Sequence, residues 1–246
     1  MPPQAKASTT GPLLLAGAVL LAVVLAVAIG LTLEEDPGDG GANASQAEPP
    51  VESRISEEQR EWGQSLARRG ADDPAALGEV DAPVVMVVYS DFTCPYCATW
   101  TQETQPELVE RYVESGDLRI EWREFPYLGD LARDLSVGAL AVAEQDAFWE
   151  YQEAVFARQE ELKSSSDPEA DLREIADDIG VDLERFDGDL QNEELLGRVD
   201  ADFLEGQQIG VSGTPAFIIN GDPVMGAQPL SVFVDSIDTA LTAAGE

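Results

Sequence analysis

The sequence predicts an α/β protein in which helices pack against a mixed sheet. Two short, β-branched apolar runs, residues 84–89 and 216–219, have the length and composition of buried strands. Residues 118–123 alternate apolar with charged side chains, which is the period of a further strand. The segments between these strands carry apolar residues at helical spacing, so helices are expected to connect them.

These elements follow one another in an order that defines the topology. A helical pattern between residues 98 and 115, interrupted by a kink at Pro106, separates the first two strands, and a connection of that length favours a parallel βαβ unit. Residues from about 130 to 210 are helical by pattern and form a predicted insertion. The strand 216–219, a turn at Asn220-Gly221, a short partner strand and a helix that begins at Pro229 complete a ββα half.

The N-terminal part of the chain predicts attachment to a membrane. Residues 12–33 are 22 residues without a charge, long enough to span a bilayer as a helix and longer than the apolar region of a signal peptide. We therefore expect a cytoplasmic segment 1–11, a transmembrane signal anchor 12–33, a flexible acidic tether 34–52 and a folded domain 53–246. Lys6 precedes the anchor, and the basic flank of a membrane segment tends to stay in the cytoplasm. We therefore expect the domain that follows the anchor to lie outside the cytoplasm. Cleavage near the Ala42-Asn43-Ala44 sequence is the alternative.

The charge of the chain excludes one class of partner. With 48 acidic and 14 basic residues the net charge is −34, which repels nucleic acid. Two explanations of this charge stay open, namely adaptation to high external salt and a general composition bias. A melting temperature that does not change between low and molar NaCl would count against salt adaptation.

All the cysteine chemistry resides in one pair, Cys94 and Cys97, and the chain has no histidine. A structural zinc site needs four Cys or His ligands, and nucleophiles activated by histidine are impossible, so no metal or cofactor is expected. The pair directly follows a strand and begins a helix, where free backbone N–H groups stabilise a thiolate. Cys94 is then the exposed nucleophile, Cys97 resolves the mixed disulfide, and Pro95 suits the first helical turn. A local structural disulfide is the alternative interpretation.

Two stretches of the chain resemble a known family. Residues 91–97, Asp-Phe-Thr-Cys-Pro-Tyr-Cys, and residues 210–217 resemble the active-site and cis-proline motifs of membrane-anchored, DsbA-like thiol–disulfide oxidoreductases of the thioredoxin superfamily. The resemblance covers about residues 71 to 243 and implies a thioredoxin fold with a helical insertion. It also implies that Thr214-Pro215 is a cis peptide against the cysteine pair, where its backbone pairs with substrate and excludes metal. Tyr96 is expected to help shape the site.

The chain departs from the family pattern at two positions. The best-known oxidants of the family have a histidine between the cysteines, whereas Pro95 and Tyr96 stand here, so we expect a less depressed Cys94 pKa and a weaker oxidant. Thioredoxin-like proteins usually have a buried acid six residues before the first cysteine, and Val88 occupies that position. Asp91 is the candidate proton carrier in its place, and Glu124 is the other.

The resemblance implies an extracytoplasmic enzyme that oxidises thiols of reduced or misfolded secreted proteins with its Cys94–Cys97 disulfide, through a mixed disulfide at Cys94. A quinone-linked membrane partner would restore the disulfide. One alternative is a reductase or isomerase that receives electrons from a membrane reductant. Another is a redox-silent binding module that uses the same fold.

Overall fold

The computed structural model describes residues 56–245. The predicted segments 1–11, 12–33 and 34–52 lie outside these residues. Among residues 56–245, no helix combines the length and apolar character needed to cross a bilayer.

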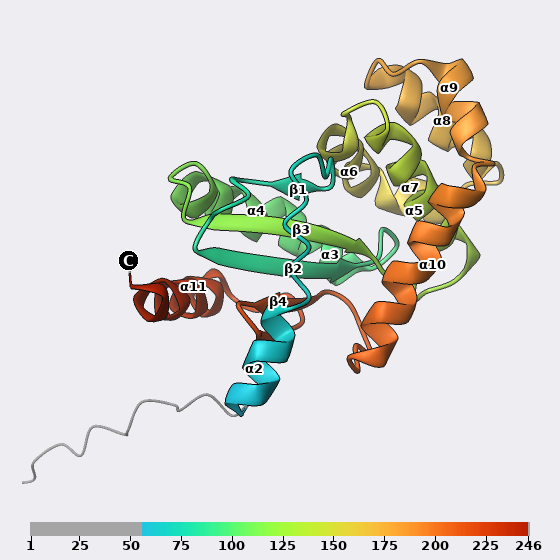
Figure 1. Ribbon diagram of the computed structural model, residues 1–246. Coiled ribbons are helices and arrows are strands. Elements are labelled where there is room, and N and C mark those ends of the chain that lie inside the picture. The colour runs from blue at the N-terminus through green and yellow to red at the C-terminus, as the bar shows by residue number, and fades with distance from the viewer. Residues whose placement is uncertain (1–55, 246) are drawn as a thin grey trace, which may run out of the picture. The chain divides into compact units, whose positions relative to one another are not determined.

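A five-stranded sheet in the order β1-β3-β2-β4-β5 forms the centre of the domain (Figure 1). β2 and β3 are parallel, and their register runs from Val84 opposite Leu118 to Ser90 opposite Glu124. β4 is antiparallel to β2, and β5 and β1 are antiparallel to β4 and β3 respectively. The predicted order of a βαβ unit, a helical insertion and a ββα half is confirmed. The strands are β1 (Ala76–Leu77), β2 (Val84–Ser90), β3 (Leu118–Glu124), β4 (Ala216–Ile219) and β5 (Asp222–Met225).

The helices occupy the predicted segments. The single helix expected between β2 and β3 is instead a continuous run of short α-helical and π-helical pieces on either side of Pro106, because proline supplies no N–H to the regular ladder. The helices are α2 (Glu57–Gln64), α3 (Pro95–Thr99), η1 (Trp100–Thr104), α4 (Gln105–Leu108), η2 (Val109–Val113), α5 (Asp130–Ala143), α6 (Phe148–Ala157), α7 (Gln159–Ser164), α8 (Pro168–Asp178), α9 (Leu183–Asp189), α10 (Glu193–Gln208) and α11 (Leu230–Ala244).

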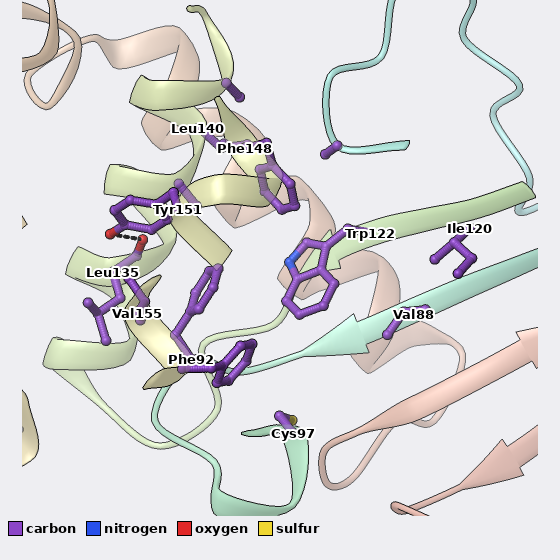
Figure 2. Packing of buried hydrophobic residues seen from close by; sticks show 14 of the residues in the cluster. Val88, Phe92, Cys97, Ile120, Trp122, Leu135, Leu140, Phe148, Tyr151 and Val155 are labelled. Atoms are coloured by element: carbon purple, nitrogen blue, oxygen red, sulfur yellow. Dashed lines mark hydrogen bonds between the residues drawn. The ribbon is translucent and has the colours of Figure 1, made fainter. Parts of the chain in front are cut away.

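One face of the sheet packs against α3, α4 and α11. Alternate residues of β2, among them Met86 and Val88, enter this core, and Trp100 packs on Phe217 with ring centroids 4.9 Å apart. The insertion extends the same core beyond the end of the sheet. There the rings of Phe92, Trp122 and Tyr151 lie together (Figure 2).

The opposite face packs against the segments of α2 and α10, which in Figure 1 lie below the strands and at their right-hand end. Val85, Val87 and Tyr89 of β2 form a smaller core there, against which Leu66 and Phe203 pack. α2 approaches the β4–β5 turn so closely that a Cβ atom on Gly221 would collide with the Arg60 carbonyl oxygen. Gly221 also has a φ of 94°, so glycine is required there for two reasons.

The charged residues of β3 are buried, although their alternation is also typical of a solvent-facing strand. Arg119, Glu121 and Arg123 are at most 3% exposed. The Glu121 carboxylate accepts bonds from Arg119 at 3.1 Å and Arg123 at 2.9 Å, and from the backbone N–H groups of Arg68 and Arg69. Burial alone would raise the pKa of Glu121, but these donors hold it below its ordinary value.

We expect Glu121→Gln to lower the free energy of unfolding by about 3–5 kcal/mol, because it leaves the buried Arg119 without its carboxylate partner and Arg123 with only its 3.3 Å pair to Glu205. Urea denaturation monitored by tryptophan fluorescence measures this. Glu107→Gln is the matched control, since Glu107 pairs with Arg111 at the surface, where such a pair contributes about 0.5 kcal/mol or less. Equal effects of the two changes would contradict the central role of Glu121.

Candidate active site

The two cysteines lie at the junction between β2 and the helix that follows it. Cys94 is the N-cap residue of α3 in an extended conformation, with φ −78° and ψ 122°, and Pro95 begins the helix. The Cys94 carbonyl oxygen accepts the N–H groups of Cys97 and Ala98, which places Cys97 one turn into the helix. Both cysteines are free thiols in this structure.

The loop before β4 lies against the cysteine pair. The Cys94 Sγ atom contacts the Thr214 carbonyl oxygen at 3.3 Å, and the Thr214-Pro215 peptide bond is cis, as the resemblance implies. Cys94 is 4% exposed, so the expectation of an exposed nucleophile was wrong for the dithiol form. The cause is this contact, which the sequence pattern did not include. Tyr96 is 66% exposed beside the covered thiol.

The two thiols differ in acidity. The pKa of Cys94 is lowered to about 6, chiefly by a hydrogen bond from the Cys97 thiol, while backbone N–H groups at the start of α3 assist and burial opposes the shift. Burial raises the pKa of the Cys97 thiol, and the neighbouring Cys94 raises it further. Cys94 is therefore mostly a thiolate at neutral pH, and Cys97 keeps its proton.

The Asp91 carboxylate holds two loops together. Its Oδ1 atom accepts bonds from the backbone N–H and the hydroxyl of Thr93, each at 2.7 Å, and its Oδ2 atom accepts the Leu128 N–H at 2.8 Å. These three donors fit a residue that positions the loop carrying Cys94. Its predicted role as a proton carrier stays a prediction.

Gln159 belongs to the site and was missed in the sequence. This α7 residue is buried, and its Nε2 atom donates to the carbonyl oxygens of Phe92 at 2.8 Å and Cys94 at 3.0 Å. A glutamine 65 residues after Cys94 shows no local pattern that could identify it.

The aromatic residues near the cysteines divide into two groups. Phe92 and Trp100 are fully buried core residues, whereas Tyr96 and Tyr127 are at least half exposed. Leu128, next to Tyr127, is also 55% exposed, and its backbone is tied to Asp91. Tyr96 and the Tyr127–Leu128 loop therefore present apolar surface to solvent beside the cysteine pair.

Comparison with known proteins identifies the family. Residues 71–239 match the family model described as Thioredoxin. The chain belongs to the thioredoxin family. This thioredoxin-family protein is 31% identical over 154 residues to the probable disulfide bond formation protein D of Bacillus anthracis, a match that covers 60% of this chain and 70% of that protein.

The fold of the thioredoxin-family protein is similar to that of alpha-DsbA1 from Wolbachia pipientis, with a TM-score of 0.66 and 22% identity over 74% of this chain and 97% of that chain. The resemblance to DsbA-like thiol–disulfide oxidoreductases is thereby confirmed. A 147-residue region is 37% identical to the Na(+)/H(+) antiporter NhaA 3 of Salinispora tropica and covers 58% of this chain. The chain spans only 21% of the length of that antiporter.

We expect the rate of Cys94 alkylation by iodoacetamide to reach half its maximum near pH 6, because the thiolate is the reacting species. In Cys97→Ala the main hydrogen-bond donor is gone, so the midpoint should move toward the ordinary thiol value of about 8.5. Mass spectrometry of the alkylated protein follows both reactions. Identical midpoints in the two proteins would show that Cys97 does not control the acidity of Cys94.

Proposed function

We propose that this thiol–disulfide oxidoreductase uses its Cys94–Cys97 disulfide to oxidise thiols of secreted proteins outside the cytoplasm. The difference in acidity between the two thiols carries the proposal. A thiolate that is stable in the reduced protein is a good leaving group, and it makes the dithiol form comparatively favourable. Such a cysteine pair favours transfer of its disulfide to the thiols of a substrate. The name of the Bacillus relative supports the same direction.

Transfer takes two displacement steps. A substrate thiolate attacks the Cys94 sulfur, the Cys94–Cys97 bond breaks, and Cys97 leaves with the electron pair and takes up a proton. A second substrate thiolate then attacks the substrate sulfur of the mixed disulfide, and Cys94 leaves as a thiolate. The substrate loses two electrons and gains a disulfide, and the enzyme is left reduced. No cofactor other than the Cys94–Cys97 disulfide is required.

The groups around Cys94 suit an extended polypeptide as substrate. Reaction requires the substrate to reach the sulfur where Thr214 now covers it, so the backbone at Thr214-Pro215 is the proposed pairing partner of the substrate chain. Tyr96 offers exposed apolar surface to reduced or misfolded chains, and Pro95 fixes the first turn behind it. A quinone-linked membrane protein is the proposed reoxidant, and residues 12–33 are the proposed anchor.

We expect the reduction potential of the pair to lie closer to about −120 mV than to about −270 mV, the values of a strong disulfide donor and of thioredoxin. Equilibration of the full-length protein with glutathione redox buffers, followed by alkylation and mass spectrometry, measures it. A value near −270 mV would favour the alternative of a reductase supplied with electrons by a membrane partner.

We expect Cys97→Ser, supplied with oxidised glutathione as the oxidant, to accumulate mixed disulfides between Cys94 and substrate proteins, because Cys97 is no longer present to displace the substrate from Cys94. Cys94→Ser should form none and should lose all activity toward a reduced test protein such as unfolded ribonuclease. Non-reducing electrophoresis compares the two variants. Adducts on Cys94→Ser instead would reverse the assigned roles, and adducts on neither would support a redox-silent binding module.

A further inference from the structure

Side chains, rather than regular secondary structure, hold the backbone of the loop that carries Cys94. Between β2 and α3, the Asp91 carboxylate accepts the Thr93 N–H, and the Asp91 carbonyl oxygen accepts the Cys94 N–H. The carbonyl oxygens of Phe92 and Cys94 both accept bonds from the Nε2 atom of Gln159, at 2.8 Å and 3.0 Å. Buried backbone groups outside helices and sheets need such partners. Gln159 therefore supplies the donors on the carbonyl side of the loop.

The chemistry of Gln159 suits this position. A side-chain amide nitrogen carries two N–H donors and no charge, so a single nitrogen can serve two carbonyl oxygens. A hydroxyl group has only one proton to donate, and a lysine or arginine would bring a charge into the interior. Gln159 is 5% exposed, and loss of a hydrogen-bond donor at such depth costs free energy. A neutral amide thus holds both oxygens without adding a charge beside a thiolate.

The helical insertion, and not the sheet, determines where Gln159 lies. Gln159 is the first residue of α7, and Arg158 before it caps both α6 and α7, with φ −105° and ψ 11°. The Arg158 guanidinium pairs with Glu161 of α7 at 2.9 Å and with Glu174 of α8 at 3.3 Å. These pairs tie the corner between α6 and α7 to α8. The position of Gln159 therefore depends on how these three helices pack.

The position of the loop decides which groups the Cys94 sulfur meets. Cys94 is the N-cap residue of α3, and the N–H groups of Tyr96 and Cys97 help to lower the pKa of its thiol. An N-cap side chain reaches such groups from an extended backbone, as Cys94 has with ψ 122°. This ψ angle orients the carbonyl group that Gln159 holds. A change in it would move the sulfur relative to the N–H groups and to the Thr214 carbonyl oxygen, 3.3 Å away.

We propose that Gln159 is a positioning residue through which the helical insertion sets the reactivity of Cys94. By holding the carbonyl oxygens of Phe92 and Cys94, it keeps the Cys94 sulfur at the start of α3, where free N–H groups stabilise a thiolate. Its N–H dipoles also offset the partial negative charge of the carbonyl group in the same residue as the sulfur. The inference rests on the proposed function only in taking Cys94 as the reacting sulfur, and it holds for either direction of electron flow.

The test is the pH dependence of Cys94 alkylation by iodoacetamide in the reduced full-length protein. Gln159→Met keeps the size of the side chain but has no N–H donor. Its midpoint should rise by about 0.5–1 pH unit above that of the wild type, which corresponds to the loss of about one hydrogen bond. Because the thiolate is then less stable, the equilibrium with glutathione at pH 7 should move about three- to fivefold toward the Cys94–Cys97 disulfide.

Gln152→Met is the matched control. Gln152 is a buried glutamine of α6, and its amide also joins the insertion to the helical run that follows the cysteines, because it exchanges two hydrogen bonds of 3.2 Å with Gln105 of α4. Neither of these bonds reaches the Cys94 loop. Gln152→Met should lower the melting temperature but keep the wild-type alkylation midpoint and glutathione equilibrium.

A second variant keeps the shape of the side chain. Gln159→Glu has at most one proton to donate, and its ionised form places a negative charge beside the thiolate, so its midpoint should also rise. The other titratable groups of the site stay in place, because Asp91 bonds to the Thr93 and Leu128 backbones and Cys97 bonds to the Cys94 thiol. Among the described residues, no hydrogen bond or ion pair joins Gln159 to either group.

A Gln159→Met midpoint equal to the wild-type value would overturn the inference. Equal shifts in Gln159→Met and Gln152→Met would overturn it too, and would assign the effect to packing. Thermal unfolding verifies that each variant is folded, and Gln159→Glu gives the reading if Gln159→Met does not fold. The proposed function fails separately: the oxidised wild type would then leave a reduced test protein unoxidised, whatever the alkylation midpoints.

Discussion

Parallel pairing of β2 with β3 determines where the groups of the site lie. Because parallel strands end at the same edge of a sheet, the loop that carries Cys94 and the loop that carries Leu128 leave side by side, and the Asp91 carboxylate joins them. The last pair of this ladder places Ser90 beside Glu124. A slip of β3 by one residue would turn Glu124 to the opposite face, away from Ser90 and Cys97. The alternation of β3 prevents that slip, because Leu118, Ile120 and Trp122 enter the larger core while the charged residues between them pair on the other face.

The helical insertion completes the site as well as the core. It follows β3 in the chain, yet it returns Gln159 to the carbonyl oxygens of Phe92 and Cys94. The rings of Tyr151 of α6 and Trp122 of β3 both pack against Phe92 (Figure 2). Without Gln159 the carbonyl oxygen of Phe92 would lose this donor, and that of Cys94 would keep only the N–H groups of Cys97 and Ala98. The insertion therefore fixes the backbone at the point from which the Cys94 side chain projects.

The sequence predicted the parts of this arrangement that local patterns encode. β-branched runs identified β2 and β4, and the cysteine spacing with the Thr214-Pro215 motif identified the site. β1 was not predicted, because two residues carry no period and their pairing depends on β3. The burial of Arg123 depends on Glu205 of α10, 82 residues away, and no local window contains that partner. Covering of Cys94 by Thr214 likewise arises only when distant segments meet.

The small exposed fraction of Cys94 also bears on chemical damage. A thiolate with a pKa of about 6 is the species that peroxides oxidise, first to sulfenic acid and then irreversibly to sulfinic acid. Susceptibility depends on access as well as on ionisation, and the Thr214 loop restricts access in the dithiol form. Cys97, one turn away, can convert an early sulfenic acid into a disulfide before further oxidation. The Thr214 loop, which a substrate has to displace to reach Cys94, thus also limits irreversible oxidation of the Cys94 sulfur between turnovers.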